Sequence, residues 1–244
     1  MKLIQFIFVL IFANVQAHAA QASSATKIES GVLVEKIQNV FIGNNVDIYE
    51  YNDLLKLVVV NSNAVYFASH DGRYIFGDVV LDSEQKINLV EEEKSKQRIA
   101  LLQSQAKSLF VSYPSVGKSR HTLTVFTDID CPYCRKFHNS IDDLNKRGIS
   151  INYVMLPRPI ANPSSYSKTL SALCSKNPAE TITLAMRKQE IPIQQCDTTQ
   201  LEQQRALAQS LEINATPTIV LPTGQLQMGL TETEKLVSML EEVE

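Results

Sequence analysis

The stretch Leu123–His138, LTVFTDIDCPYCRKFH, decides the fold of the second half of the chain. It begins with an apolar run, Leu123–Thr127, which is typical of a buried strand. A CxxC motif, Cys131-Pro132-Tyr133-Cys134, follows directly, and apolar residues then recur at helical spacing as far as Gly148. Because Ile149–Met155 is again strand-like, the segment predicts a βαβ unit whose CxxC motif lies where the first strand leads into the helix.

The two cysteines of this motif are predicted to have different roles. A cysteine at the start of a helix faces unpaired N–H groups and the positive end of the helix dipole, which favour the thiolate. Cys131 is therefore expected to be an exposed, acidic nucleophile, and Pro132 suits the first helical position. Cys134 should be more buried and should attack the mixed disulfide formed at Cys131. A zinc site, which needs two more ligands, and an inert structural disulfide are the alternatives.

The segment from Pro163 to Leu211 reads as mostly helical, broken by Pro178 and Pro192. Strand-like residues from Thr218 to Met228 and a last helix follow, so the second unit reads as βαβ, a helical insertion and ββα. Cys174 and Cys196 lie 22 positions apart within the insertion. We expect them to form a structural disulfide that clamps it, the alternative being a second redox-active pair.

Two further features lie close to the CxxC motif in the predicted fold. Thr216-Pro217 precedes the ββα segment, and this place predicts a cis-proline loop that faces the active cysteines. A cis bond would leave the Thr216 backbone free to pair with an extended substrate, whereas the alternative is an ordinary trans loop. His138 lies two helical turns after Cys131 and is interpreted as a helix-surface residue rather than a general base.

The first residues have the layout of a secretory signal peptide, expected to span residues 1–20. Lys2 precedes the apolar run Leu3–Ala13, and small residues follow at positions suited to cleavage. A membrane anchor is the weaker alternative, because the run is shorter than the ~20 residues that span a bilayer. Export would place the cysteines in an oxidising compartment, where disulfides persist.

The rest of the chain divides into three parts. Residues 23–86 read as a strand-rich unit with a short helix near Val32–Ile37 and a hairpin at Asp71-Gly72. Residues 87–112 are predicted to form a linker helix that starts at Asn88, is polar on most sides and crosses between the units through solvent. Residues 113–244 form the unit that carries the CxxC motif. The formal net charge of −3 shows no basic footprint of a nucleic-acid binder.

Several segments resemble the DsbC-type disulfide isomerases of the thioredoxin superfamily. They are Leu123–His138, Gly148–Arg158, Ala215–Val220 and the hairpin Ala64–Tyr74. The resemblance implies an α+β N-terminal cystatin-like dimerisation domain, a linker helix and an α/β thioredoxin-like fold with a helical insertion. It also implies a V-shaped homodimer that is reduced again by a DsbD-type membrane reductase. Neither the motifs nor the resemblance requires a cofactor or a metal ion.

The predicted function is that of a periplasmic thiol:disulfide interchange protein with chaperone activity. It would reduce and isomerise non-native disulfides of misfolded exported proteins at Cys131 and Cys134, with substrate bound by Pro132, Tyr133 and the Thr216-Pro217 loop. One departure concerns the dipeptide between the cysteines, since many DsbC proteins carry Gly-Tyr and the DsbG group carries Pro-Tyr. A DsbG-like reductase of oxidised cysteines, a DsbA-type oxidant and a non-catalytic chaperone are therefore the alternatives.

Overall fold

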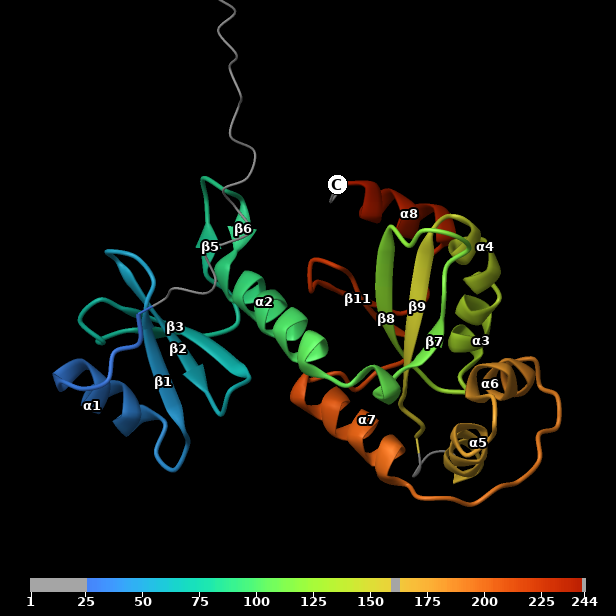
Figure 1. Ribbon diagram of the computed structural model, residues 1–244. Helices are drawn as coiled ribbons and strands as arrows, with labels where there is room; N and C mark the ends of the chain where they lie inside the picture. The colour runs from blue at the N-terminus through green and yellow to red at the C-terminus, as the bar shows by residue number, and fades with distance from the viewer. Residues whose placement is uncertain (1–25, 159–162, 243–244) are drawn as a thin grey trace, which may run out of the picture.

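The computed structural model describes residues 26–158 and 163–242, which fold into two units joined by one helix (Figure 1). The predicted signal peptide, residues 1–20, lies outside the described residues. The N-terminal unit contains a four-stranded antiparallel sheet in sequence order: β1 (Val46–Glu50), β2 (Leu55–Val60), β3 (Ala64–Ser69) and β4 (Ile75–Phe76).

Period-two alternation in β2 gives this sheet two apolar faces. Val58 and Val60 pack with the buried residues of helix α1 (Val32–Val40) on one face. Leu57 and Val59 face the other way and pack against the first turn of helix α2 (Leu89–Ser104). The sheet is therefore covered by a helix on each face.

The hairpin predicted at Asp71-Gly72 is confirmed. It joins β3 to β4, and the Asp71 carboxylate accepts hydrogen bonds from the Ser69 hydroxyl at 2.6 Å and the Arg73 N–H at 3.0 Å. Gly72 adopts a φ of +67°, a left-handed conformation that suits glycine. A second, short hairpin, β5 (Leu81–Asp82) with β6 (Ile87–Asn88), leads into α2.

Helix α2 starts as predicted, because the Asn88 side chain caps it by accepting from the Val90 N–H. The prediction that it crosses between the units through solvent is wrong. Its first turn packs on the N-terminal sheet, and Leu101 and Leu102 near its other end pack on the second unit. Arg98, buried in spite of its charge, donates at 3.2 Å to the Gly224 carbonyl of the second unit.

The helix is also shorter than the predicted linker 87–112. It ends at Ser104, a 3₁₀ turn spans Lys107–Leu109, and strand β7 occupies Val111–Tyr113. Val111 pairs with Tyr153 of the second sheet. Residues that the sequence analysis placed at the end of the linker helix therefore form an edge strand of this sheet. Burial of Val111 on that sheet favours the strand over a further helical turn.

The second unit is built on a five-stranded sheet with the order β11-β10-β8-β9-β7. Strands β8 (His121–Thr127) and β9 (Ile149–Met155) are parallel, and the other pairs, which include β10 (Thr218–Val220) and β11 (Leu226–Met228), are antiparallel. The predicted βαβ unit and the final ββα order are confirmed.

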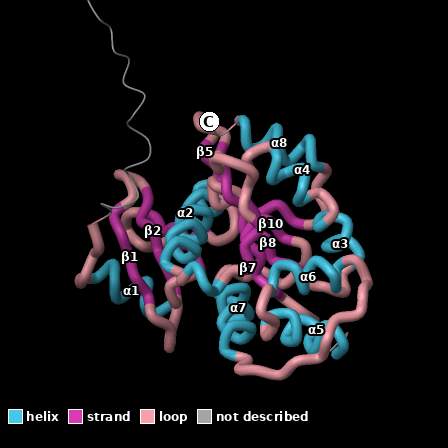
Figure 2. Tube along the Cα trace, turned by 45° about the vertical axis from the view of Figure 1, so that its right-hand side comes forward, coloured by secondary structure: helices cyan, strands magenta, loops and turns pink. Residues whose placement is uncertain are grey.

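Helices cover both faces of this sheet (Figure 2). Val125, Tyr153 and Ile219 share a core with α3 (Pro132–His138), α4 (Ile141–Lys146) and α8 (Thr233–Glu241). Their neighbours Phe126, Val154 and Val220 pack against α7 (Thr199–Ser210) on the other face. The insertion consists of α5 (Pro163–Leu173), α6 (Pro178–Met186) and α7.

The helix predicted to run from the CxxC motif to Gly148 is broken. Helix α3 ends at His138 and α4 begins at Ile141, with the Ser140 hydroxyl donating to the Phe137 carbonyl at 2.7 Å. Serine that bonds back to the preceding turn in this way competes with the helical hydrogen bonds. The segment ends at Gly148, as predicted, and this residue has a φ of +81°, the left-handed conformation in which glycine commonly follows a helix.

Candidate active site

The two cysteines of the CxxC motif lie at the N-terminus of α3. Cys131 is the N-cap residue and Pro132 occupies the first turn, as predicted. Both side chains are free thiols. Cys131 is only 4% exposed, so the prediction of an exposed sulfur is wrong. The loop before β10 accounts for this burial, because the Cys131 Sγ lies 3.5 Å from the Thr216 carbonyl oxygen, to which it donates.

Cys134 is fully buried one turn further along α3, in the core between the helix and the sheet. Burial raises the pKa of the Cys134 thiol to about 12, and the neighbouring Cys131 acts in the same direction. Cys134 therefore stays protonated at neutral pH. This fits a second, resolving thiol and does not fit the nucleophile that starts the reaction.

The peptide bond between Thr216 and Pro217 is cis, so the cis-proline prediction is confirmed. Pro217 is buried, while Thr216 is half-buried and Tyr133 is 58% exposed. The Lys136 ammonium lies 5.8 Å from the centre of the Tyr133 ring, within the range of a cation–π contact. Tyr133 is thus a large apolar surface directly beside Cys131.

A buried carboxylate, Asp128, lies in the loop between β8 and Cys131. It is fully buried and accepts hydrogen bonds from the Arg158 Nε at 2.8 Å and from the Ser165 hydroxyl. The hydrogen bond to Asp128 raises the pKa of Arg158, and negative charge on either active-site sulfur adds to this effect. The Arg158 cation is therefore within electrostatic reach of both thiols.

A second carboxylate of the same loop, Asp130, ties the loop to two helices. It accepts from Arg135 of α3 at 2.7 Å and from Lys168 of α5 at 3.0 Å. Burial opposes ionisation of Asp130, but hydrogen bonds from Lys168 and Ser164 and the charges of Lys168 and Arg135 hold its pKa below the ordinary value. Sequence reasoning assigned no role to either carboxylate, although two acidic residues within the three positions before a CxxC motif were a signal.

The interpretation of His138 as a surface residue is wrong. The ring is 6% exposed, its Nδ1 lies 3.1 Å from the Tyr153 hydroxyl, and its Nε2 lies 3.1 Å from the Thr183 hydroxyl of α6. Burial, with the nearby charge of Arg187, lowers the pKa of His138 to about 4. The insertion covers this side of α3, and the sequence alone does not show where α6 packs.

The predicted Cys174–Cys196 disulfide is present, with the two Cα atoms 5.7 Å apart. It joins the end of α5 to the long segment before α7. In residues 26–158 and 163–242, no group of three His, Cys, Asp or Glu side chains is arranged to hold a metal ion. Among the same residues, no helix is both long and apolar enough to cross a membrane.

The fold and the paired thiols define a thioredoxin-like protein. A family model described as a thioredoxin-like domain matches residues 115–244, and the chain belongs to this family. In particular, it is similar to the thiol:disulfide interchange protein DsbC of Escherichia coli K12, with 27% identity over 190 residues that cover 77% of each chain. DsbC of Haemophilus influenzae is 25% identical over 221 residues, covering 91% of this chain and 94% of the relative.

Solved structures show the same fold. The disulfide interchange protein from Neisseria gonorrhoeae superposes with a TM-score of 0.51 and 23% identity, covering 57% of this chain and 97% of that one. Proteus mirabilis ScsC in a transitional conformation gives a TM-score of 0.51 and 18% identity over 61% of this chain and 79% of that one. The resemblance to DsbC-type proteins is confirmed, and with it the enzyme class, a thiol–disulfide oxidoreductase.

Proposed function

We propose that this chain is an exported disulfide isomerase of the DsbC type, which acts in the periplasm on non-native disulfides of misfolded proteins and also serves them as a chaperone. The observation that carries the proposal is the dithiol at the N-terminus of α3, with Cys131 against the Thr216 carbonyl and Cys134 buried behind it. The similarity to DsbC proteins over most of the chain supports the same function.

In the proposed reaction the Cys131 thiolate attacks one sulfur of a client disulfide. A Cys131–client disulfide forms, and the other client sulfur leaves as a thiolate. For isomerisation, a client thiolate then attacks the mixed disulfide at the client's sulfur, forms a new client disulfide and releases the Cys131 thiolate. For reduction, Cys134 loses its proton and attacks the Cys131 sulfur, which releases a client thiolate and leaves a Cys131–Cys134 disulfide. A DsbD-type membrane reductase would return the two electrons.

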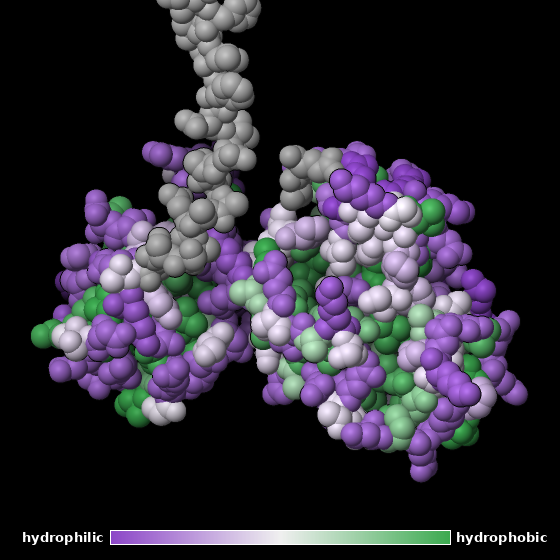
Figure 3. Space-filling view, in the orientation of Figure 1, coloured by the Kyte–Doolittle hydropathy of each residue, from purple (hydrophilic) through white to green (hydrophobic). Residues whose placement is uncertain are grey.

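The N-terminal unit is proposed to be the cystatin-like dimerisation domain of a homodimer. Large exposed apolar side chains support this proposal, since eight of the thirteen in the described residues belong to this unit: Val32, Val40, Ile42, Leu54, Tyr74, Phe76, Val79 and Leu81. Apolar residues break its hydrophilic surface in several places (Figure 3). Such surface is typical of a contact with another chain. Two facing active sites would hold a client near both dithiols and raise their effective concentration.

Refolding of scrambled ribonuclease tests the proposed activity. We expect the full chain to restore ribonuclease activity and Cys131→Ser to abolish it, because the exchange starts at that sulfur. Thr216→Arg should slow the reaction with protein clients, since it obstructs the loop beside Cys131, and should leave the reaction with a small disulfide within about twofold of the full chain's rate. A chain that suppresses aggregation but never exchanges disulfides would instead be a non-catalytic chaperone.

The role of the N-terminal unit has a separate test. A chain that begins at Ser108 retains β7 and the rest of the second unit. In analytical ultracentrifugation it should be a monomer, whereas the full chain should be a dimer. The shortened chain should still reduce disulfides and should lose most of its isomerase activity. Full isomerase activity of this monomer would refute the dimerisation role.

A further inference from the structure

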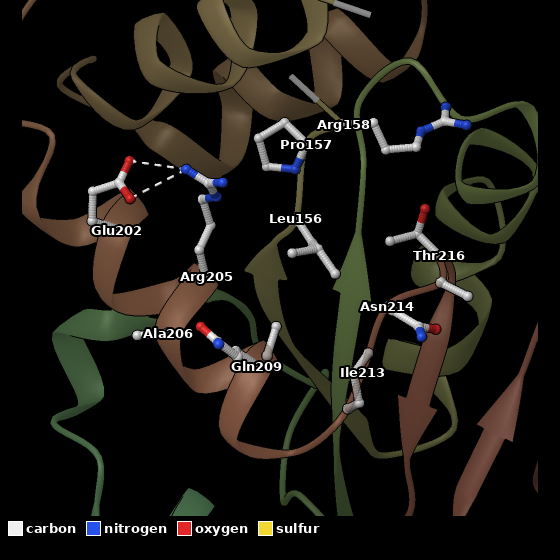
Figure 4. Close-up of a pocket in the computed structure, with 12 residues that line it drawn as sticks. Leu156, Pro157, Arg158, Glu202, Arg205, Ala206, Gln209, Ile213, Asn214 and Thr216 are labelled. Carbon is white, nitrogen blue, oxygen red and sulfur yellow. Dashed lines mark hydrogen bonds and ion pairs between the residues drawn. The ribbon is translucent and has the colours of Figure 1, made fainter. Parts of the chain in front are cut away.

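A groove beside Thr216 extends the candidate active site towards α7. Its volume is about 790 Å³, and its walls come from the chain after β9, from α7 and from the loop before β10. Leu156 lies in its middle, with Arg205 and Gln209 on one side and Asn214 and Thr216 on the other (Figure 4). Pockets of some 300–1,000 Å³ hold ligands larger than one side chain, so this groove has room for a short stretch of polypeptide.

The groove has an apolar floor and a polar rim. Leu156, Pro157 and Ile213 form the floor, and each is at least partly buried. The exposed amides of Gln209 and Asn214 stand on the rim, where they can hydrogen-bond the backbone of a bound chain. An apolar centre within a polar rim is the usual anatomy of a protein-binding surface.

The charges at the groove disfavour a charged ligand. Arg205 is paired with Glu202 at 3.2 Å, and Arg158 is paired with the buried Asp128 at 2.8 Å. An acidic ligand would compete with Glu202 or Asp128 for its cation, and a basic ligand would meet both arginines. An uncharged apolar side chain fills the floor at no such cost.

The groove is continuous with the reacting thiol. Thr216 lines the groove, and its carbonyl lies 3.5 Å from the Cys131 Sγ. A client cysteine joined to Cys131 therefore lies beside the mouth of the groove. Since an extended chain advances about 3.3 Å per residue, the next one or two client residues reach the floor.

We propose that this groove is a client subsite that takes large apolar side chains adjacent to the client's cysteine. The inference rests on the proposed function, because the groove is defined by its position relative to the exchange at Cys131. The groove would make the enzyme selective for disulfides whose cysteines are flanked in the client sequence by apolar residues. Such neighbours are buried in correctly folded proteins and exposed in misfolded ones.

Peptide disulfides test this preference directly. The probes are the disulfide-linked dimers of Gly-Leu-Cys-Leu-Gly, Gly-Gln-Cys-Gln-Gly and Gly-Asp-Cys-Asp-Gly, with oxidised glutathione as a small disulfide. We expect the reduced full chain to react about tenfold faster with the leucine peptide than with the other two, since burial of one leucine side chain supplies at least that factor. Equal rates for the three peptides, or the fastest rate for the aspartate peptide, would overturn the proposal.

A filled groove gives the second test. Ala206 is an exposed residue of α7 that lines the groove, whereas Gln203 is exposed on the same helix and does not line it. Ala206→Trp should remove the preference for leucine, and the control Gln203→Trp should keep it. The preference is measured within each variant as the ratio of the leucine-peptide rate to the glutamine-peptide rate. Circular dichroism checks that each variant is folded; if Ala206→Trp is not, Ala206→Leu repeats the test with a smaller side chain.

The outcomes separate this proposal from the one on which it rests. A leucine preference that survives in a folded Ala206 variant would refute the subsite alone. Failure of the unsubstituted chain to reduce glutathione and all three peptides would refute the proposed exchange chemistry itself.

Discussion

Replacement of His138 should change how the stability of the second unit depends on pH. The ring is 6% exposed and bonded at both nitrogens, and burial lowers its pKa from 6.5 to about 4. In the unfolded chain the imidazole titrates near its ordinary value. Between these two pKa values the unfolded chain binds a proton that the folded chain does not bind. The stability that depends on neutral His138 is therefore complete above about pH 6.5 and is lost as the pH falls towards 4.

The size of the effect follows from the shift in pKa. Each pKa unit corresponds to about 1.4 kcal/mol of unfolding free energy. Lowering the pH from about 7 to about 5 should therefore reduce the free energy of unfolding by about 2 kcal/mol through this residue. His138→Gln keeps a hydrogen-bonding side chain that does not titrate, and it should remove this part of the pH dependence. The matched control for the substitution itself is His70→Gln, at a histidine that is exposed in the N-terminal unit.

Urea unfolding followed by circular dichroism at the two pH values measures the free energy of unfolding of each protein. We expect the difference between pH 7 and pH 5 to be about 2 kcal/mol smaller in His138→Gln than in the unsubstituted chain. Equal pH dependence in these two proteins would show that the ring is not held neutral and that its burial has another explanation.

Two further substitutions test contacts away from the thiols. Gly224→Ala should lower the melting temperature, because a Cβ at Gly224 would lie 2.1 Å from the Ser95 carbonyl oxygen of α2. The control in the same thermal melts is Gly229→Ala, since Gly229 has a similar φ of +82° and nothing lies within 4 Å of its Cβ. Equal losses of melting temperature in the two variants would contradict this reasoning. Replacing Cys174 and Cys196 together with Ala should lower the free energy of unfolding in urea by about 3 kcal/mol and leave the reduction of a small disulfide within about twofold. If the two cysteine pairs of the full chain were reduced at the same potential, the second pair would be redox-active rather than structural.

The sequence predicts well the elements whose patterns are local. Strand β9 has the bounds predicted from its sequence, Ile149–Met155, because its apolar residues alternate with the half-buried Ser150 and Asn152 and then continue to its buried end. The turn at Gly72 and the cap at Asn88 were also predictable, since each depends on residues within a few positions. The cis bond before Pro217 followed from its place in the order of elements rather than from its own residues.

Features that depend on distant segments were predicted poorly. Asp128 is held by Arg158 and Ser165, which lie 30 and 37 positions further along the chain. The burial of Cys131 depends on the loop at Thr216, 85 positions away. Spacing along the chain carries no information about such contacts. The order of elements placed the Thr216-Pro217 loop opposite the cysteines, but it did not show that this loop buries Cys131 or that Arg158 and Ser165 hold Asp128.

The most direct test of the central claim is to measure which thiol reacts first. The reduced full chain is treated briefly with iodoacetamide at about pH 7, and the modified cysteine is identified by mass spectrometry. Because burial raises the pKa of Cys134 to about 12, we expect carbamidomethyl on Cys131 and none on Cys134 at early times. In the same way, Cys134→Ser should accumulate disulfides between Cys131 and client proteins. Faster modification of Cys134 would contradict the assignment of Cys131 as the thiol that starts the exchange.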